Sequence, residues 1–191
     1  MEKSHRVPWF PAWGIKFQDP IDDPMEKVNQ FNEWRPNERW FLMAFDVAAS
    51  EVHLWTVWHA LRRREVSGKM TARTPDAEFL RILSGTHQIR TAFERAGLTK
   101  GDEQAWIIHI PELEIGTGFA NIEIPRDIFN ENTKQAERLQ LHLEASLVVK
   151  RPMPSNEGLV RIGSLNEGER IPSEYMENTF LNHAAMADMN G

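Results

Sequence analysis

The chain has no cysteine, and other hallmarks of secreted and membrane proteins are also missing from it. Without cysteine it can form neither a disulfide nor a cysteine-ligated zinc site. No apolar run approaches the roughly 20 residues that a membrane-spanning helix needs. Residues 1–6 are polar and lack the apolar stretch of a signal peptide. These absences predict a cytoplasmic protein that has no membrane partner.

The motifs that identify many enzymes are missing as well. The sequence contains no GxSxG, HExxH or GxGxxG and no glycine-rich phosphate-binding loop. Its seven histidines do not fall at spacings that would bring several ligands to one metal ion. We therefore expect a protein without catalytic residues, metal, cofactor or small-molecule substrate. A small enzyme that uses Glu78 or His87 remains an alternative.

The length and composition predict one domain. A chain of 191 residues with 41% hydrophobic residues can bury a substantial core. Residues 1–38 hold five of the eleven prolines and show no clear period, so we expect an extended lead-in that packs on the core, with a short helix at Pro24–Trp34. Residues 39–187 are expected to form the domain, with an α+β (mixed α/β) fold in which several short helices pack on a small central sheet.

Apolar spacing predicts the individual elements. Short apolar runs predict strands at residues 40–47, 104–110 and 159–162. Caps and apolar faces of helical period predict helices at residues 51–66, 74–83, 86–96, 133–143 and from 173 to about 187. Residues 145–150 could extend the fourth of these helices or form a strand.

Two short helices between Arg73 and Gly97 are the most distinctive part of the chain. Phe79, Ile82 and Leu83 form the apolar face of the first helix, which places Arg81 on the opposite, outer face. Residues 51–100 carry nine Lys or Arg and five Asp or Glu, a local net charge of +4 in a chain whose total is −6. This basic segment could neutralise RNA phosphates, and the backbone amides of residues 85–88 could bind one of them. It could equally be an ordinary solvated face.

A family resemblance rests on the same segment. Residues 78–89 read EFLRILSGTHQI and residues 92–97 read AFERAG. With the arginine-rich helix before them and the strand after Gly101, they resemble the central motif of the kinase-binding subunit of the KEOPS (EKC) complex, the PRPK-binding protein family. The resemblance covers about residues 40–111. It implies a non-catalytic subunit of a complex that transfers a threonylcarbamoyl group to an adenosine in the tRNA anticodon loop.

The resemblance also implies two partners, because family members bind the small atypical kinase subunit and hold the single-stranded CCA end of tRNA. The residues predicted to bind tRNA are Arg64, Lys69, Arg73, Arg81, Ser84, Gly85, His87, Gln88 and Arg90. The residues predicted to bind the kinase are Met176, Phe180 and Leu181 on the last helix. The alternative is a module that binds the kinase subunit alone, with incidental basic residues. The sequence leaves open which cations contact RNA, which surface docks the kinase, what the lead-in does and which oligomer forms.

Overall fold

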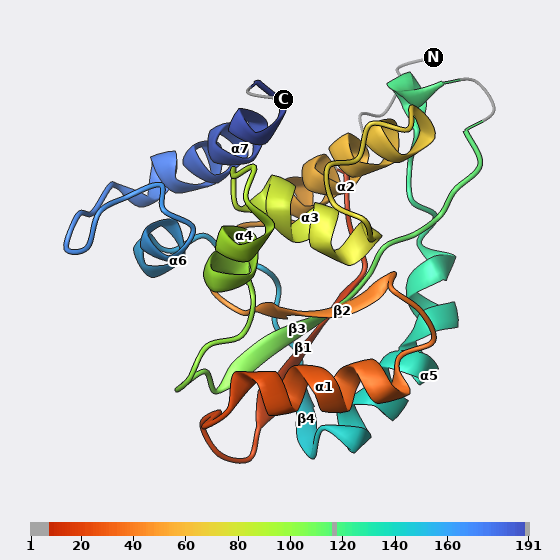
Figure 1. Cartoon of the computed structure of the whole chain (residues 1–191), viewed down its shortest axis with the longest axis vertical. Helices are drawn as coiled ribbons and strands as arrows, with labels where there is room; N and C mark the ends of the chain where they lie inside the picture. Colours follow the sequence, from red (N-terminus) through yellow and green to blue (C-terminus); the bar gives the residue numbers. More distant parts are fainter. Residues whose placement is uncertain (1–7, 116–117, 190–191) are drawn as a thin grey trace.

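A four-stranded antiparallel sheet runs through the middle of the molecule and separates its helices into two layers (Figure 1). The structure is a computed structural model that describes residues 8–115 and 118–189. The strands are β1 (Ala12–Phe17), β2 (Trp40–Ala44), β3 (Gln104–His109) and β4 (Ala145–Val148), in the order β2-β3-β1-β4. The predicted α+β fold in one domain is confirmed.

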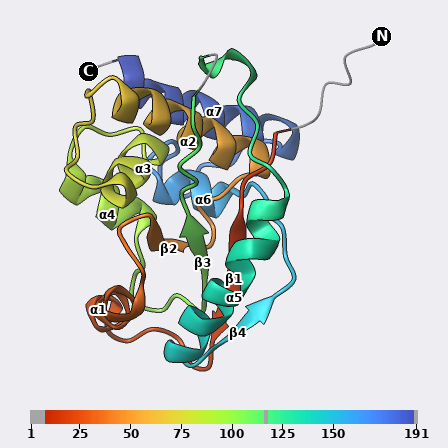
Figure 2. The same cartoon turned by 90° about the vertical axis from the view of Figure 1, so that its right-hand side faces the viewer.

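The helices lie on both faces of this sheet, as the side view in Figure 2 shows. One layer contains α2 (Glu51–Val66), α3 (Pro75–Leu83), α4 (Ile89–Ala96), α6 (Asn156–Arg161) and α7 (Ser173–Met189). The other contains α1 (Pro24–Trp34) and α5 (Asp127–His142). A short 3-10 helix, η1 (Phe119–Asn121), lies in the connection between β3 and α5.

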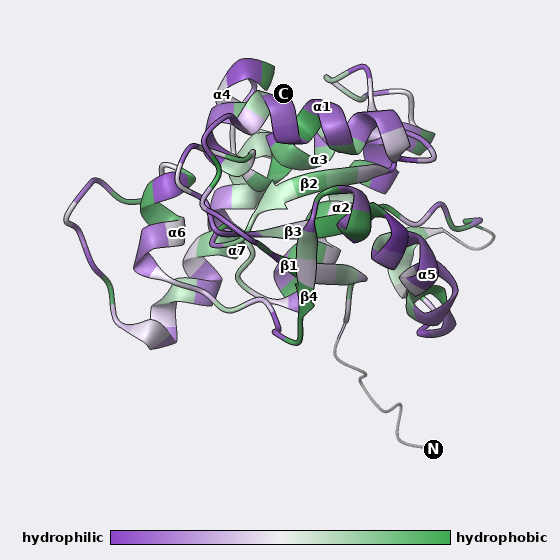
Figure 3. Cartoon of the chain, turned by 90° about the horizontal axis from the view of Figure 1, so that it is seen from below, coloured by the Kyte–Doolittle hydropathy of each residue, from purple (hydrophilic) through white to green (hydrophobic). Residues whose placement is uncertain are grey.

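Burial of both sheet faces explains the continuous apolar runs of β2 and β3. Successive side chains of a strand point to opposite faces, so a strand that is covered on both sides needs apolar residues throughout. In β3, Trp106 and Ile108 pack against the layer that holds α2, whereas Ala105 and Ile107 pack against the layer that holds α1. In Figure 3, β2 is coloured as hydrophobic, while α5 at the outside is largely hydrophilic.

The predicted lead-in proves to be part of the sheet. Residues 12–17 form β1, an inner strand that pairs with β3 on one side and β4 on the other. Trp9, Phe10 and Trp13 are buried, which agrees with their predicted packing on the core. The prolines conceal the strand because they flank it at positions 8, 11 and 20 and leave its backbone amides free to pair.

Several other predictions of local structure need correction. Residues 159–162, predicted as a strand, lie in and after α6, because four apolar residues suit a buried helix turn as well as a strand. Of the two alternatives left open for residues 145–150, the strand is the one found, since residues 145–148 form β4 after the preceding helix has ended. That helix, α5, begins at Asp127 rather than at residue 133. The predicted helix at 86–96 begins only at Ile89, because Thr86 bonds through its hydroxyl to the amide of Gln88 in a turn before the helix.

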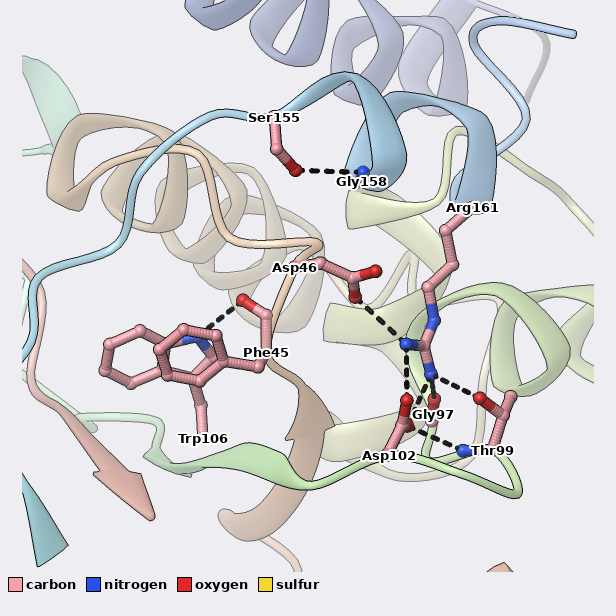
Figure 4. Close-up of polar contacts among 9 residues, drawn as sticks. All are labelled: Phe45, Asp46, Gly97, Thr99, Asp102, Trp106, Ser155, Gly158 and Arg161. Carbon is pink, nitrogen blue, oxygen red and sulfur yellow. Dashed lines mark hydrogen bonds and ion pairs between the residues drawn. The ribbon is translucent and has the colours of Figure 1, made fainter. Parts of the chain in front are cut away.

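Arg161 at the end of α6 fastens this short helix to the rest of its layer (Figure 4). Its guanidinium lies 3.0 Å from Asp46 in the loop after β2 and 2.7 Å from Asp102 in the turn before β3. It also donates to the carbonyl of Gly97 at 2.8 Å. Ser155 caps the helix by accepting from the amide of Gly158 at 3.0 Å. The loop after β2 and the connection between α4 and β3 are thus both bound to a single side chain of α6.

Close packing of α6 on the loop after β2 predicts the effect of one substitution. A Cβ at Gly158 would lie 1.9 Å from the carbonyl oxygen of Asp46. We expect Gly158→Ala to lower the unfolding free energy by about 2 kcal/mol or more, as overpacking of a core does, although alanine normally stabilises a helix interior. Thermal unfolding should show a Tm about 5 °C lower. The exposed Glu157→Ala in the same helix is the control, and an unchanged or raised Tm for Gly158→Ala would contradict the packing.

Candidate nucleic-acid interface

The predicted tRNA-binding residues divide into exposed and buried groups. Lys69 and Arg73, in the loop between α2 and α3, are exposed, as are His87 and Gln88 in the turn between α3 and α4. In the part of the chain that the structure describes, the side chains of Lys69, Arg73 and His87 make no hydrogen bond or ion pair. The loop leads into the start of α3 and the turn follows its end. Lys69 and Arg73 are therefore separated from His87 and Gln88 by the length of this one helix.

A buried ion pair lies on α3 between this loop and this turn. Glu78 and Arg81 are both 0% exposed. The Arg81 guanidinium donates from Nη2 to Oε1 of Glu78 at 2.7 Å and from Nε to Oε2 at 3.0 Å. Burial alone would raise the pKa of Glu78, but the hydrogen bonds from Arg81 and from the amides of Ala72 and Thr71 outweigh it, so the pKa lies below its ordinary value. The carboxylate is therefore charged at neutral pH.

Arg81 is thus wrongly predicted as a phosphate contact. The prediction assumed that α3 has an outer face, but all residues from Ala77 to Leu83 are buried. Helix α3 packs against α2, α4, α7 and β2, and this packing leaves none of these seven side chains exposed. The two charges at i and i+3 were the available signal, because opposite charges at this spacing on a helix are neighbours.

Ser84 and the backbone of the following turn are also occupied within the protein. The carbonyl of Ser84 accepts from Arg95 at 3.1 Å and lies 2.8 Å from Nε2 of His183 on α7, while its side chain is buried. Gly85 has a φ of +60°, and a Cβ there would lie 2.5 Å from the carbonyl of His183. The turn therefore requires glycine for conformation and for space.

The backbone amides of this turn are less available to a phosphate than predicted. The amide of Gly85 donates to Ile82 at 3.0 Å and that of Thr86 donates to Arg81 at 3.3 Å. The amide of Gln88 donates to the hydroxyl of Thr86 at 3.2 Å. Three of the four predicted donors are thus already used, and contact with RNA would depend on the exposed side chains.

The remaining predicted cations are Arg64 in the last turn of α2 and Arg90 in the first turn of α4. Arg64 is half-buried, and its guanidinium donates to the carbonyls of Lys69 at 3.5 Å and Ala187 at 3.3 Å. These two bonds connect the loop between α2 and α3 to α7. Arg90 on α4 is exposed and pairs with Glu94 at 2.9 Å, as its i, i+4 spacing predicts. An exposed pair of this kind can exchange its carboxylate for a phosphate at little cost.

Two of the three residues predicted to bind the kinase face the interior. Met176 is buried, Phe180 is 0% exposed and Leu181 is half-buried. Phe180 packs against His53 of α2, with ring centroids 5.3 Å apart. The apolar stripe of α7 packs the helix on its own protein, so Met176 and Phe180 are not exposed to a partner as predicted.

An open apolar groove lies on another part of the surface, between α1 and α4. Its volume is about 770 Å³, and its floor is formed by β2 and α3. Met25 on one lip and Phe93 on the other are 64% and 47% exposed. The apolar residues along it are Met25, Val28, Phe31, Phe41, Leu42, Leu80, Phe93 and Leu98. Nothing in the sequence pattern marks this groove, because Met25 and Phe93 on its two lips are 68 residues apart in the chain.

Comparison with known proteins adds no family assignment. No protein-family model matches the sequence, and no curated protein matches it. Within residues 8–115 and 118–189 no helix is long and apolar enough to cross a membrane. The same residues contain no group of three or more His, Asp or Glu side chains that could hold a metal ion.

The lowered pKa of Glu78 predicts how stability depends on pH. A carboxylate whose pKa is lower in the folded state stabilises the fold above its unfolded pKa, and this contribution is lost as pH falls through the folded value. We expect Glu78→Gln to lower the unfolding free energy by about 3 kcal/mol at neutral pH, because Arg81 is left buried without its partner. The difference from the native protein should shrink as the pH falls below 4.5, the ordinary pKa of a glutamate.

Urea unfolding between pH 7 and pH 3 measures this difference. The buried His53 and His109, whose pKa values burial lowers to about 3 and about 4, affect both proteins equally and cancel in the difference. Glu137→Gln on the exposed side of α5 is the control. A difference that stays constant over the whole range would show that Glu78 does not carry the charge.

Proposed function

We propose that the protein is a non-catalytic, cytoplasmic accessory subunit of a KEOPS-like tRNA threonylcarbamoyladenosine modification complex, which binds the kinase subunit and the CCA end of tRNA. The RNA part rests on the exposure of Lys69, Arg73, His87 and Gln88, which lie beyond the two ends of α3. We name these four residues the loop–turn surface. The identity of the complex rests on the sequence resemblance.

The chemistry of the loop–turn surface suits a single-stranded RNA end. Two cations without protein partners in the described structure can neutralise backbone phosphates. The imidazole of His87 offers a planar face for stacking on an unpaired base, and the amide of Gln88 can bond to a base edge. The Gln88 side chain already accepts from the hydroxyl of Thr91 at 3.1 Å, which orients it toward the first turn of α4. Single-stranded bases have free edges and faces, so such a surface favours an unpaired end over a duplex.

Binding of intact and CCA-trimmed tRNA tests this proposal. We expect trimming of the CCA end to weaken binding, and affinity for intact tRNA to fall as salt rises. Arg73→Glu should weaken binding roughly tenfold and reduce the salt dependence by about one phosphate contact. Arg151→Glu, the same change at an exposed arginine between β4 and α6, is the matched control. Equal affinity for intact and trimmed tRNA would refute the RNA part.

A second candidate, a kinase-binding module that does not bind RNA, is favoured by the groove between α1 and α4. Two arginines that line the groove are already paired with carboxylates within the protein, which favours a protein partner over RNA. Arg35 lies 2.6 Å from Asp76, and Arg90 lies 2.9 Å from Glu94. An apolar floor with a rim of both charge signs is the usual anatomy of a protein interface. On this proposal the kinase subunit binds in the groove and not at the residues of α7 that the sequence predicted.

Charge introduced at the lips of the groove tests that candidate. We expect Met25→Glu and Phe93→Asp each to weaken kinase binding at least about tenfold, because a buried apolar anchor is replaced by a charge. Leu141→Asp on α5 is a control, since Leu141 is also exposed and apolar but lies away from the groove. The readout is co-purification and titration with the isolated kinase subunit. Undiminished binding by both groove variants would reject the groove as the docking site.

A further inference from the structure

The Glu78–Arg81 pair forms hydrogen bonds with the backbone on both sides of α3, in the loop before it and in the turn after it. On one side, Oε2 of Glu78 accepts from the backbone amides of Ala72 at 2.8 Å and Thr71 at 3.2 Å. On the other side, Nη1 of Arg81 donates to the backbone carbonyl of Thr86 at 3.2 Å. One buried pair therefore holds the loop that ends with Arg73 and the turn that precedes His87.

The bonds of this pair depend on one another. Both side chains are 0% exposed, so water cannot replace a partner that moves away. If the turn opens, Arg81 loses an acceptor, and if the loop opens, Glu78 loses two donors. A partly satisfied buried ion pair is much less stable than a fully satisfied one. Movement of the loop therefore raises the free energy of the pair that also fixes the turn, and the reverse holds equally.

We propose that Glu78 and Arg81 are positioning residues that hold the two halves of the loop–turn surface in one fixed relation, so that a single-stranded RNA end binds to both halves as a unit. This inference rests on the proposed function, because the ligand is the one proposed there. Neither side chain touches the RNA. Each acts through the backbone that carries Lys69 and Arg73 on one side and His87 and Gln88 on the other.

The first test uses the protein without RNA. If the pair couples loop and turn, the amides of Ala72 and Thr86 open in one event, and their hydrogen-exchange protection in the native protein should agree within about threefold. Arg81→Lys keeps the charge but loses the forked contact to Glu78 and Thr86. It should speed exchange at Ala72 as well as at Thr86. Protection of Ala72 that differs from that of Thr86 by more than about tenfold, or that is unchanged in Arg81→Lys, would overturn the coupling.

The second test is a double-mutant cycle on binding of intact tRNA. The side chains of Arg73 and Gln88 form no hydrogen bond with each other in the described structure, so their substitutions should be additive unless something couples them. We expect the loss for Arg73→Ala with Gln88→Ala to be smaller than the product of the single losses by about fivefold or more. In the Arg81→Lys background the same losses should multiply within about twofold.

A control separates positioning from a general loss of stability. Leu139 lies in α5, in the core on the opposite face of the sheet, so Leu139→Ala destabilises the protein away from the loop–turn surface. When its unfolding free energy is matched to that of Arg81→Lys, Leu139→Ala should retain the non-additivity between Arg73→Ala and Gln88→Ala. No binding of tRNA by the native protein would overturn the proposed function and with it the RNA role of the pair. Binding with purely multiplicative losses in the native background would overturn the positioning role alone.

Discussion

Both faces of the four-stranded sheet are covered by helices, and this burial determines the environment of nearly every other element. One layer holds five helices over a small sheet, so α3 is enclosed by α2, α4, α7 and β2. Residues 77–83 of this helix are buried, so any charge among them must find its partners inside the protein. Glu78 and Arg81 satisfy each other and then use their remaining bonding capacity on the neighbouring backbone.

This arrangement separates the residues that shape the candidate surface from those that could touch a ligand. The exposed polar groups lie in a loop and a turn, as is usual for binding residues on a rigid scaffold. The groups that hold the loop and turn come from helices: Glu78 and Arg81 from α3, Arg95 from α4 and His183 from α7. Most residues of the motif on which the family resemblance rests therefore lie in the interior. Of its exposed residues, His87 and Gln88 belong to the loop–turn surface, whereas Phe93 and Glu94 line the groove.

The predictions from local sequence succeeded where one element determines its own conformation. Helix α1 spans the predicted residues, and Ser50 caps α2 by accepting from the amide of His53 at 3.0 Å. The predictions failed where packing against distant elements decides the conformation of a segment. A strand with prolines at its flanks was taken for an extended lead-in, and four apolar residues of α6 were taken for a strand. In a segment this short, the pattern of apolar residues does not distinguish a strand from a buried helix turn or from an extended connection.

The sequence by itself determined the fold class, the boundaries of most helices and the concentration of basic residues between positions 51 and 100. It did so because caps, apolar period and charge are properties of residues close together in the chain. Only the tertiary structure decided that Arg81, Ser84 and Phe180 are buried while Arg73 and His87 are exposed. The helical period gives the direction of a side chain from its own axis, whereas exposure depends on which distant elements pack in that direction.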